Sequence, residues 1–372
     1  MKISALDESS QPVDWWFLYK VPQLTEHANT AGATGYEYVY YDPGRSRVER
    51  SKNLLMDGKG ALDLTLGSVF GAPDTTTGWV LYNDEMPADA KRRDNPSLGH
   101  TKGVIAFDTA TATALWLLHS WPKYADPGAT AMPAPTYGQT FLCISLDMPT
   151  ASKIAAQMAI YQEPQSYLPR LPDSLPRDDP LRLVTQPLNM RAPGDSEALD
   201  FRSRNGLAFK VIAKNRNWGK DFWNDLVGPT LAADMDVETW IRGPIPPIVD
   251  SDGVHRIFDI KYINLNPLGA PWAWPESKDH AKWGITTTSG WVCVGDINRM
   301  ISQENRGGGT IAFQDQVLWQ ALQQTDLIVP PPGHSETEAR RLIKATHRRS
   351  KPDVPNTPTR IRTLTKRDKG ES

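Results

Sequence analysis

The chain has 372 residues, a formal net charge of −2, and 39% hydrophobic and 9% aromatic residues, which suits an ordinary globular protein. No apolar run approaches the length of about 18 residues that would span a membrane, and the N-terminus lacks the apolar core of a signal peptide. We therefore expect no membrane association, and either a cytoplasmic location or export without a classical leader. Two isolated cysteines, Cys143 and Cys293, exclude a disulfide scaffold and a cysteine zinc site, and both are expected to be reduced core thiols.

The charge is unevenly distributed along the chain. Residues 340–372 contain eleven Lys or Arg against three Asp or Glu, a net +8 that leaves −10 for residues 1–339. This basic tail is rich in proline and is expected to be disordered beyond about residue 350. It could hold nucleic acid through phosphates or remain a solvated extension. In the acidic body, positive charge for such a contact would have to gather in a groove, with candidates Lys91 to Arg93, Arg202, Arg204, Lys210, Lys214, Arg216 and Lys220.

The first part of the chain reads mostly as strands. Short runs of apolar, aromatic and β-branched residues predict strands at 13–20, 36–42, 78–84, 102–109, 113–120 and 141–147. Residues 149–162 carry Thr150 and Ser152 in their first turn and continue with apolar residues at helical spacing, which predicts a helix. Residues 163–195 are proline-rich and predict an irregular connection that wraps a surface.

The second part repeats this mixture of strands and helices. Strands are expected at 207–214, 237–243, 255–266, 291–298 and 309–314, with a short helix at 220–232 and a closing helix at 314–327. A loop at 266–279 leads to His280.

One small motif occurs twice in this pattern. The sequence GHTKG carries His100 and Lys102, and DHAKWG carries His280 and Lys282. Each His-x-Lys pair is followed by an apolar strand with a polar residue at its end, His119 in the first part and Asn298 in the second. A Gly-x-Thr sequence then leads into another apolar strand in both parts. This order of events indicates duplication and two halves related by a pseudo-two-fold axis.

The repeated pair has a chemical interpretation. Residues i and i+2 of a strand project to the same face, so two such pairs across a pseudo-dyad would place two imidazoles and two ammonium groups in one pocket. The lysines would neutralise the oxygens of a phosphodiester, one neutral histidine would attack phosphorus, and the other would protonate the leaving oxygen. Such a site needs no divalent metal or cofactor. The alternative is that both pairs are solvated loop edges, and His119 is equally well explained as a histidine at the edge of the core.

Supporting residues are expected near the second motif. The Asn298 amide could donate to a phosphoryl oxygen. Arg306 precedes three glycines that lack the lysine and the spacing of a P-loop, so we interpret this turn as structural, with Glu304 and Arg306 supporting the site. Asp108 is expected to end a strand and not to be catalytic.

At these motifs the chain resembles the deoxyribonuclease II family, acid endonucleases related to the phospholipase D superfamily. The resemblance covers most of residues 9–325 and is carried, in the family's order, by SSQPVDWWFLYKVP, LYND, GHTKGV, HSWPKY, TYGQTFLCIS, DHAKWG, VCVGDINR and NRGGGT. It implies an α+β fold of two pseudo-two-fold-related phospholipase D-like halves, each a mostly β-sheet layer flanked by helices, with the sheets packed together. The halves would be residues 1–162 and 196–328, joined by the connection at 163–195 and followed by a tail at 329–372.

The resemblance also implies an activity. It is that of a metal-independent endonuclease that cleaves double-stranded DNA through a phosphohistidine, leaves 3′-phosphate and 5′-hydroxyl ends and works best at acidic pH. The catalytic residues would be His100, Lys102, His280 and Lys282, with His119 and Asn298 as support, and His100 is favoured as the nucleophile. Two alternatives stay open, namely a phospholipase D-like enzyme for another phosphodiester and a DNA-binding protein without catalysis. A homodimer is also compatible with the sequence.

The chain departs from the animal members of that family, which are usually secreted or lysosomal and stapled by disulfides. The position expected to hold the partner of Cys293 is Ala312, and Cys143 also lacks its N-terminal partner. Lysosomal location therefore does not transfer, and a bacterial-type, disulfide-free member is indicated. The basic tail is not part of the family pattern.

Overall fold

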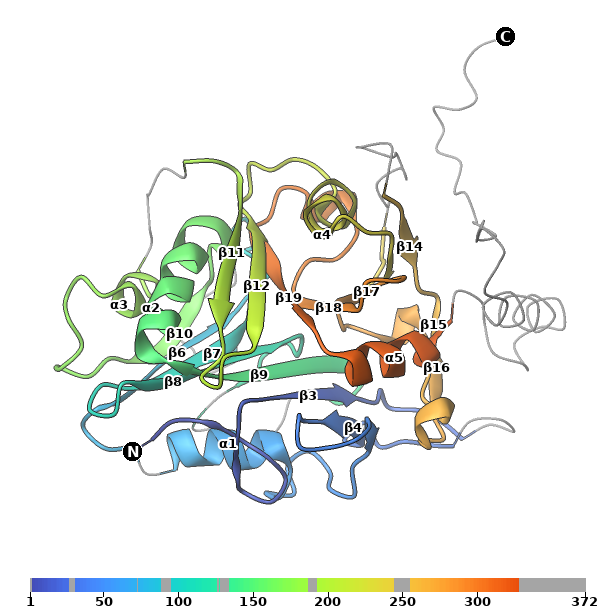
Figure 1. The fold of residues 1–372 in the computed structure, drawn as a ribbon, viewed down its shortest axis with the longest axis horizontal. Helices are drawn as coiled ribbons and strands as arrows, with labels where there is room; N and C mark the ends of the chain where they lie inside the picture. Colours follow the sequence, from blue (N-terminus) through green and yellow to red (C-terminus); the bar gives the residue numbers. More distant parts are fainter. Residues whose placement is uncertain are drawn as a thin grey trace, which may run out of the picture.

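The computed structural model describes residues 2–26, 31–71, 73–87, 95–125, 127, 134–186, 193–243 and 255–327. The basic tail and the segment Lys91 to Arg93 lie outside these ranges. Two large β-sheets dominate the described chain, with helices against their outer faces and edges (Figure 1). The predicted α+β class is therefore confirmed. None of the helices in these ranges is both long and apolar enough to cross a bilayer.

The first sheet has eight strands, and every neighbouring pair in it is antiparallel. Its order is β10-β6-β7-β8-β9-β3-β4-β5. The strands are β3 (Trp15–Lys20), β4 (Tyr38–Tyr41), β5 (Glu49–Arg50), β6 (Thr77–Asn83), β7 (Lys102–Asp108), β8 (Thr113–His119), β9 (Gln139–Asp147) and β10 (Ser166–Arg170). A short separate pair, β1 (Ala5–Leu6) and β2 (Pro12–Val13), precedes them.

The second sheet has seven strands in the order β11-β12-β19-β18-β17-β13-β14, of which only β13 and β14 are parallel. They are β11 (Ser196–Arg202), β12 (Ala208–Lys214), β13 (Met235–Glu238), β14 (Ile257–Asp259), β17 (Trp283–Thr286), β18 (Trp291–Gly295) and β19 (Gly308–Gln314). A small three-stranded sheet of β16 (Ala273–Pro275), β15 (Tyr262–Asn264) and β20 (Asp326–Leu327) lies beside it.

The two large sheets repeat one arrangement. The neighbouring strands β6-β7-β8-β9-β3 of the first sheet correspond to β13-β17-β18-β19-β12 of the second. After β9 comes helix α2 (Met148–Gln157), and after β19 comes helix α5 (Gln316–Thr325), each capped by an aspartate that accepts a backbone N–H of its first turn. This shared order supports the duplication inferred from the sequence.

The strand register corrects one detail of the repeat. Lys20 pairs with Gln139 in the first sheet, and Lys214 pairs with Gly308 in the second. This register makes Gly138 the equivalent of Gly307, so the Gly-x-Thr sequences of the two halves are out of step by one residue. Asn298 likewise lies three residues beyond the last residue of β18, whereas His119 is the last residue of β8.

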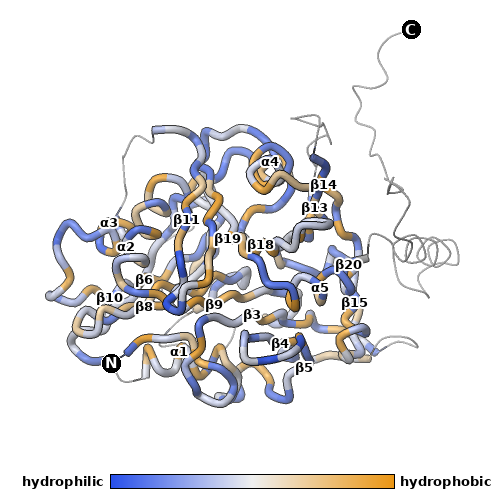
Figure 2. The backbone as a smooth tube through the Cα atoms, in the orientation of Figure 1, coloured by the Kyte–Doolittle hydropathy of each residue, from blue (hydrophilic) through white to orange (hydrophobic). Residues whose placement is uncertain are grey.

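Hydrophobic and hydrophilic residues are interspersed along the strands (Figure 2). Their apolar side chains form three layers. The largest lies between the two sheets and contains residues such as Phe17, Ile105 and Phe313. A second layer packs helix α1 (Ala61–Phe70) against the outer face of the first sheet, and a third packs a helical segment against the outer face of the second. Cys143 belongs to the second layer and Cys293 to the third, and both are free and buried. The sheets thus separate the two thiols.

Several elements differ from the sequence predictions. Helix α1 had not been predicted, and residues 163–195, predicted to be irregular, contribute strand β10 and helix α3 (Pro180–Leu183). Helix α2 continues as a π-helical turn at Met158–Gln162, and the predicted helix at 220–232 is a π-helical turn (Trp223–Val227) followed by α4 (Gly228–Leu231). The described residues of the second half also form 3₁₀ turns at Asn266–Leu268, Glu276–Lys278 and Ile301–Gln303.

Candidate active site

The two His-x-Lys pairs meet where the sheets pack together, and each histidine is held by the opposite half. The His100 N–H donates to the Gly307 carbonyl at 2.8 Å, and the His280 N–H donates to the Gly138 carbonyl at 2.9 Å. Both glycines are required by close approach. A Cβ on Gly138 would lie 2.7 Å from an Asp279 carboxylate oxygen, and one on Gly307 would lie 2.7 Å from the Gln162 carbonyl oxygen. These reciprocal bonds join the motifs into one site.

His100 has a defined orientation. Its Nδ1 lies 2.6 Å from the backbone carbonyl oxygen of Asp296. A carbonyl oxygen can only accept, so in the neutral ring Nδ1 carries the proton and Nε2 presents its lone pair. That Nε2 lies 3.6 Å from Oδ2 of Asp84. Burial lowers the pKa of His100 well below its usual value. The charge of Asp84 opposes this shift, and the charges of Lys102, Lys282 and Arg306 add to it.

Asp84 collects the cations of the first motif. One carboxylate oxygen bonds the Lys102 ammonium, and the other lies 3.3 Å from the Arg306 guanidinium nitrogens. Burial opposes ionisation of the Asp84 carboxyl, but its interactions with the His100 ring and with the cations of Lys102 and Arg306 outweigh burial and hold its pKa far below the usual range. His100 and Lys102 therefore face the same carboxylate, as expected for residues i and i+2 at the start of β7.

Arg306 also fixes the approach to His100. Its guanidinium donates to the carbonyls of Leu98 at 3.1 Å and Gly99 at 3.0 Å. The sequence prediction that Arg306 supports the site therefore has a geometric basis. Glu304 contributes through its backbone, since its carbonyl oxygen accepts from the Lys214 ammonium at 3.0 Å.

Lys282 is buried close to Lys102. Burial, and next the charge of Lys102, lower the pKa of Lys282 to about 7. Its ammonium donates to the backbone carbonyl of His280. Asp296, on the segment after β18, has its pKa raised well above the usual value by burial, and one of its carboxylate oxygens has no hydrogen-bond partner among the described residues. Two lysines thus concentrate positive charge at a site with little water to screen it.

His280 has an aromatic environment instead of a polar one. Its ring stacks on Tyr137 with a centroid distance of 3.9 Å and an interplanar angle of 10°, and Trp240 contacts it at 4.0 Å and 49°. Burial lowers its pKa strongly, and the charges of Lys282 and Lys102 act in the same direction. Its Nε2 has no hydrogen-bond partner in the described part of the chain. The hydrogen-bonding capacity of this buried nitrogen is therefore unused among the described residues.

The segment before Lys282 is fixed by Asp279. Its carboxylate accepts the Tyr19 hydroxyl at 2.5 Å, the Trp274 indole N–H at 2.6 Å and the Ala281 backbone N–H at 2.7 Å. Tyr19 belongs to β3 of the first sheet, so this bond also crosses between the halves. Asp279 therefore holds the second motif against the first sheet.

His119 and Asn298 are both buried, at 1% and 2% exposure. The His119 Nδ1 accepts the Trp121 backbone N–H at 3.2 Å, which leaves the proton of the neutral ring on Nε2. Burial, and then the charge of Lys102, lower the pKa of His119 to about 3. Within the described residues, neither His119 Nε2 nor Asn298 Oδ1 has a partner. Their role as support stays a prediction.

Asp108 ends β7, as expected. Its carboxylate accepts hydrogen bonds from Thr76, Thr77 and Thr111, and it belongs to the turn after the strand. Two of the residues expected to place positive charge in a groove, Lys214 and Arg204, instead bond to backbone carbonyls of the protein. Lys214 is fully buried, and the Arg204 guanidinium donates to the carbonyls of Ile3, Ala114 and Leu146 inside the fold.

Sequence reasoning missed Asp84, Tyr137 and Trp240. Asp84 follows the apolar strand β6, and a carboxylate directly after a buried strand is a signal that could have placed it near the site. Tyr137 stands immediately before the glycine that binds His280, and Trp240 follows the end of β13 at the same edge of the sheet. Only the strand order brings these residues together.

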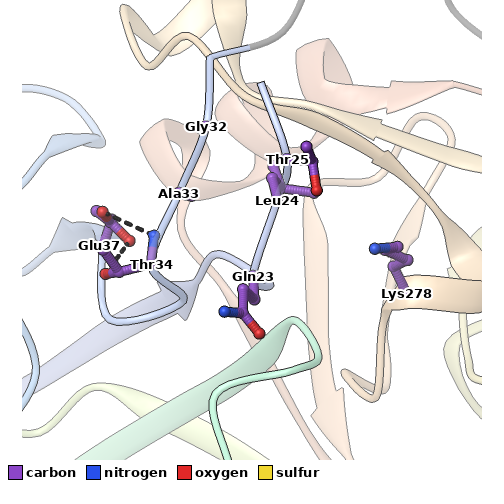
Figure 3. A pocket seen from close by; sticks show the side chains of 8 residues that line it. All are labelled: Gln23, Leu24, Thr25, Gly32, Ala33, Thr34, Glu37 and Lys278. Atoms are coloured by element: carbon purple, nitrogen blue, oxygen red, sulfur yellow. Dashed lines mark hydrogen bonds between the residues drawn. The ribbon is translucent and has the colours of Figure 1, made fainter. Parts of the chain in front are cut away.

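A separate surface pocket of about 430 Å³ lies near the second motif (Figure 3). Its lining includes Gln23, Thr34, Glu37 and Lys278 and none of the four His-x-Lys residues. Among the described residues, no group of three or more His, Cys, Asp or Glu side chains could hold a metal ion.

The two large sheets repeat one strand order, and the two His-x-Lys motifs lie together between them. The family model for Deoxyribonuclease II matches residues 4–330. The chain belongs to the deoxyribonuclease II family, and the predicted deoxyribonuclease activity is confirmed at this level.

Relatives of this chain agree with that membership. A Burkholderia pseudomallei protein with the name "Putative deoxyribonuclease-2" is 67% identical over 347 residues, which cover 93% of this chain and 99% of that protein. Deoxyribonuclease-2-alpha of Rattus norvegicus is 31% identical over 327 residues, covering 86% and 92%. Plancitoxin-1 of Acanthaster planci is 30% identical over 328 residues, covering 86% and 90%.

Proposed function

We propose that this protein is an endonuclease that hydrolyses phosphodiester bonds of double-stranded DNA without a divalent metal. The reaction passes through a phosphohistidine, leaves 3′-phosphate and 5′-hydroxyl ends, and is favoured at acidic pH. The observation that carries the proposal is the meeting of both His-x-Lys pairs in one buried site, each histidine bonded to a glycine of the other half.

His100 is the better nucleophile of the two histidines. The bond from Nδ1 to the Asp296 carbonyl leaves the Nε2 lone pair free to attack phosphorus. As the Nε2–P bond forms and the bond from phosphorus to the 5′-oxygen breaks, the imidazole acquires positive charge. Asp84, whose Oδ2 lies 3.6 Å from Nε2, favours that charge.

His280 then acts as the proton donor. It delivers a proton to the leaving 5′-oxygen in the first step. In the second step it takes a proton from the water that attacks phosphorus, and the P–N bond breaks to leave a 3′-phosphate. One water is consumed, and both histidines return to their starting states.

The lysines and Arg306 form the charge clamp of the proposed reaction. In this proposal their cations neutralise the phosphate oxygens, and the burial of Lys102 and Lys282 strengthens each interaction. This arrangement supports catalysis by side chains alone. The bound phosphate also favours the protonated form of His280, whose pKa is low in the free protein, so that acid conditions supply the required proton.

Incubation with supercoiled plasmid in EDTA, at pH 5 and at pH 7, tests the proposal. We expect nicked and linear products in EDTA, faster at pH 5, with 5′ ends that polynucleotide kinase labels without prior phosphatase treatment. His255→Ala, at a histidine outside the site, is the matched control and should cleave like the wild type. Loss of cleavage on chelation would overturn the mechanism, and plasmid retardation without cleavage would indicate a DNA-binding protein instead.

A further inference from the structure

Two buried lysines occupy equivalent positions behind the site. Lys20 is the last residue of β3 and Lys214 the last residue of β12, and these strands correspond in the two sheets. Both residues have 0% exposure. Fully buried lysines are rare, because removal of an ammonium group from water is costly unless its hydrogen bonds are replaced. Their occurrence at both copies of one position calls for a role.

Each ammonium group is bonded by three backbone carbonyl oxygens. Lys20 donates to Val21 at 3.1 Å, Pro135 at 2.9 Å and Tyr137 at 2.6 Å. Lys214 donates to the carbonyls of Gln303, Glu304 and Arg306, the first at 2.8 Å. Three donors thus meet three acceptors, which is the full capacity of an ammonium group.

The bonded loops are those that hold the histidines of the opposite half. Tyr137, a Lys20 acceptor, stacks on His280, and the next residue, Gly138, accepts the His280 N–H. On the other side, the residue that follows the Lys214 acceptor Arg306 is Gly307, which accepts the His100 N–H. Each lysine therefore bonds the residue that directly precedes the glycine to which a histidine of the other half donates.

We propose that Lys20 and Lys214 are positioning residues that tether these loops, so that Lys20 sets the geometry of His280 and Lys214 sets that of His100. Neither lysine touches the reacting atoms. The assignment of their separate effects rests on the proposed roles of His100 as nucleophile and His280 as proton donor.

The tethers depend on protonation. An ammonium group has three N–H donors and a neutral amine two, so loss of the proton leaves one loop carbonyl without its donor. Burial lowers the pKa of both lysines to about 7. The charges of Asp279 and Glu37 oppose this shift at Lys20. At Lys214 the charges of Glu304, Glu163 and Asp221 oppose it, and the charge of Arg306 adds to it. The Trp121 ring also faces the Lys20 ammonium at 5.2 Å. Both tethers are complete below pH 7 and weaken above it.

Two substrates separate the tethers. On DNA at pH 5, Lys20→Met and Lys214→Met should each lower kcat by about 100-fold with little change in KM, as expected for misplaced catalytic groups. The second substrate is a thymidine 3′-phosphodiester of p-nitrophenol, whose leaving group needs no proton. The rate of nitrophenolate release in the first turnover should be within about 3-fold of wild type in Lys20→Met, because no proton donor is needed. In Lys214→Met that rate should stay about 100-fold lower than wild type, because the nucleophile is misplaced. Lys153→Met, an exposed lysine bonded to one carbonyl, is the matched control.

Imidazole NMR gives a readout independent of catalysis. Lys20→Met should shift the ¹⁵N signals of His280 and leave those of His100, and Lys214→Met should do the reverse. Lys20→Gln and Lys214→Gln, which keep two N–H donors, serve if the methionine variants do not fold, and their shifts should have the same pattern.

The outcomes are distinct. Wild-type rates and unshifted histidines in both lysine variants, with His100→Ala and His280→Ala inactive, would overturn the tethers and leave the proposed function intact. Active His100→Ala would instead overturn the proposed function, and the NMR shifts would still decide the tethers. If the substrate pattern is reversed between the two lysines, the tethers stand and the histidine roles exchange.

Discussion

The two histidines have matching backbone frames and different side-chain surroundings. Both N–H groups donate to a glycine of the opposite half, and both glycines follow a loop bonded by a buried lysine. Around the rings the symmetry ends. His100 faces the Asp84 carboxylate and the Asp296 carbonyl, whereas His280 lies between Tyr137 and Trp240.

This contrast indicates which features duplication kept. The frame that places each imidazole was retained in both halves, since a displaced ring would disable either role. The groups that set the electrostatics of the rings diverged. A carboxylate favours the charge of a phosphorylated imidazole, and an aromatic enclosure without a fixed partner for Nε2 leaves that nitrogen free to exchange a proton with substrate. These surroundings are the basis of the different roles that we propose for the two copies.

The largest expected effect comes from removing either histidine. His100→Ala and His280→Ala should each lower cleavage of DNA by a factor on the order of 10⁴ or more, as for other residues that form or break bonds. The nitrophenyl substrate sharpens the comparison. His280→Ala should accumulate a phosphohistidine that intact-mass spectrometry detects, because the second step lacks its base, and His100→Ala should form none. An adduct on His280 in the His100 variant would reverse the assignment.

The next largest effects are expected from replacing Lys102 and Lys282, and they should differ between the two lysines. Lys102 is paired with Asp84, whereas the Lys282 ammonium donates to a backbone carbonyl and keeps a charge that no ion pair with a described residue offsets. We expect Lys282→Met to lower kcat on DNA at pH 5 by about 10²–10³-fold, the range for loss of one preorganised donor in a buried site. Lys102→Met should lower kcat by a smaller factor. Wild-type turnover in Lys282→Met would contradict a clamp built from both halves.

Much of this site was predictable from the sequence, and the reason is repetition. A single His-x-Lys carries little information, but two copies in the same order of strands identified His100, Lys102, His280 and Lys282, which the structure brings together. Asp84 was not predictable in the same way, because its approach to Lys102 depends on the pairing of Asn83 with Lys102 between β6 and β7. Lys214 was misread as a surface cation, because a strand end gives no periodicity that distinguishes a buried lysine from an exposed one.

Asp84 tests the polar side of the comparison. Asp84→Asn keeps the shape of the side chain and removes its charge. The phosphorylated His100 then loses a stabilising partner, and the cations of Lys102 and Arg306 lose the anion that they share. We expect kcat to fall by about 10-fold and the affinity for DNA to stay equal or rise. Stopped-flow turnover and a binding titration separate these effects. Weaker binding with unchanged kcat would show that Asp84 only maintains the fold.

An effect of similar size is the loss of activity above neutral pH, which tests the charge of Lys282, two residues after His280. The pKa of Lys282 is lowered to about 7, so its charge is present below that pH and is lost as pH rises through it. Between pH 6 and pH 8 the charged fraction falls about 10-fold, and kcat should fall with it. Lys282→Arg stays charged throughout. Its ratio of kcat at pH 6 to kcat at pH 8 should therefore be smaller than that of the wild type, even if both rates are lower. An equal ratio would mean that Lys282 does not titrate in this range. The fall of kcat at high pH would then come from loss of the His280 proton and from deprotonation of Lys20 and Lys214.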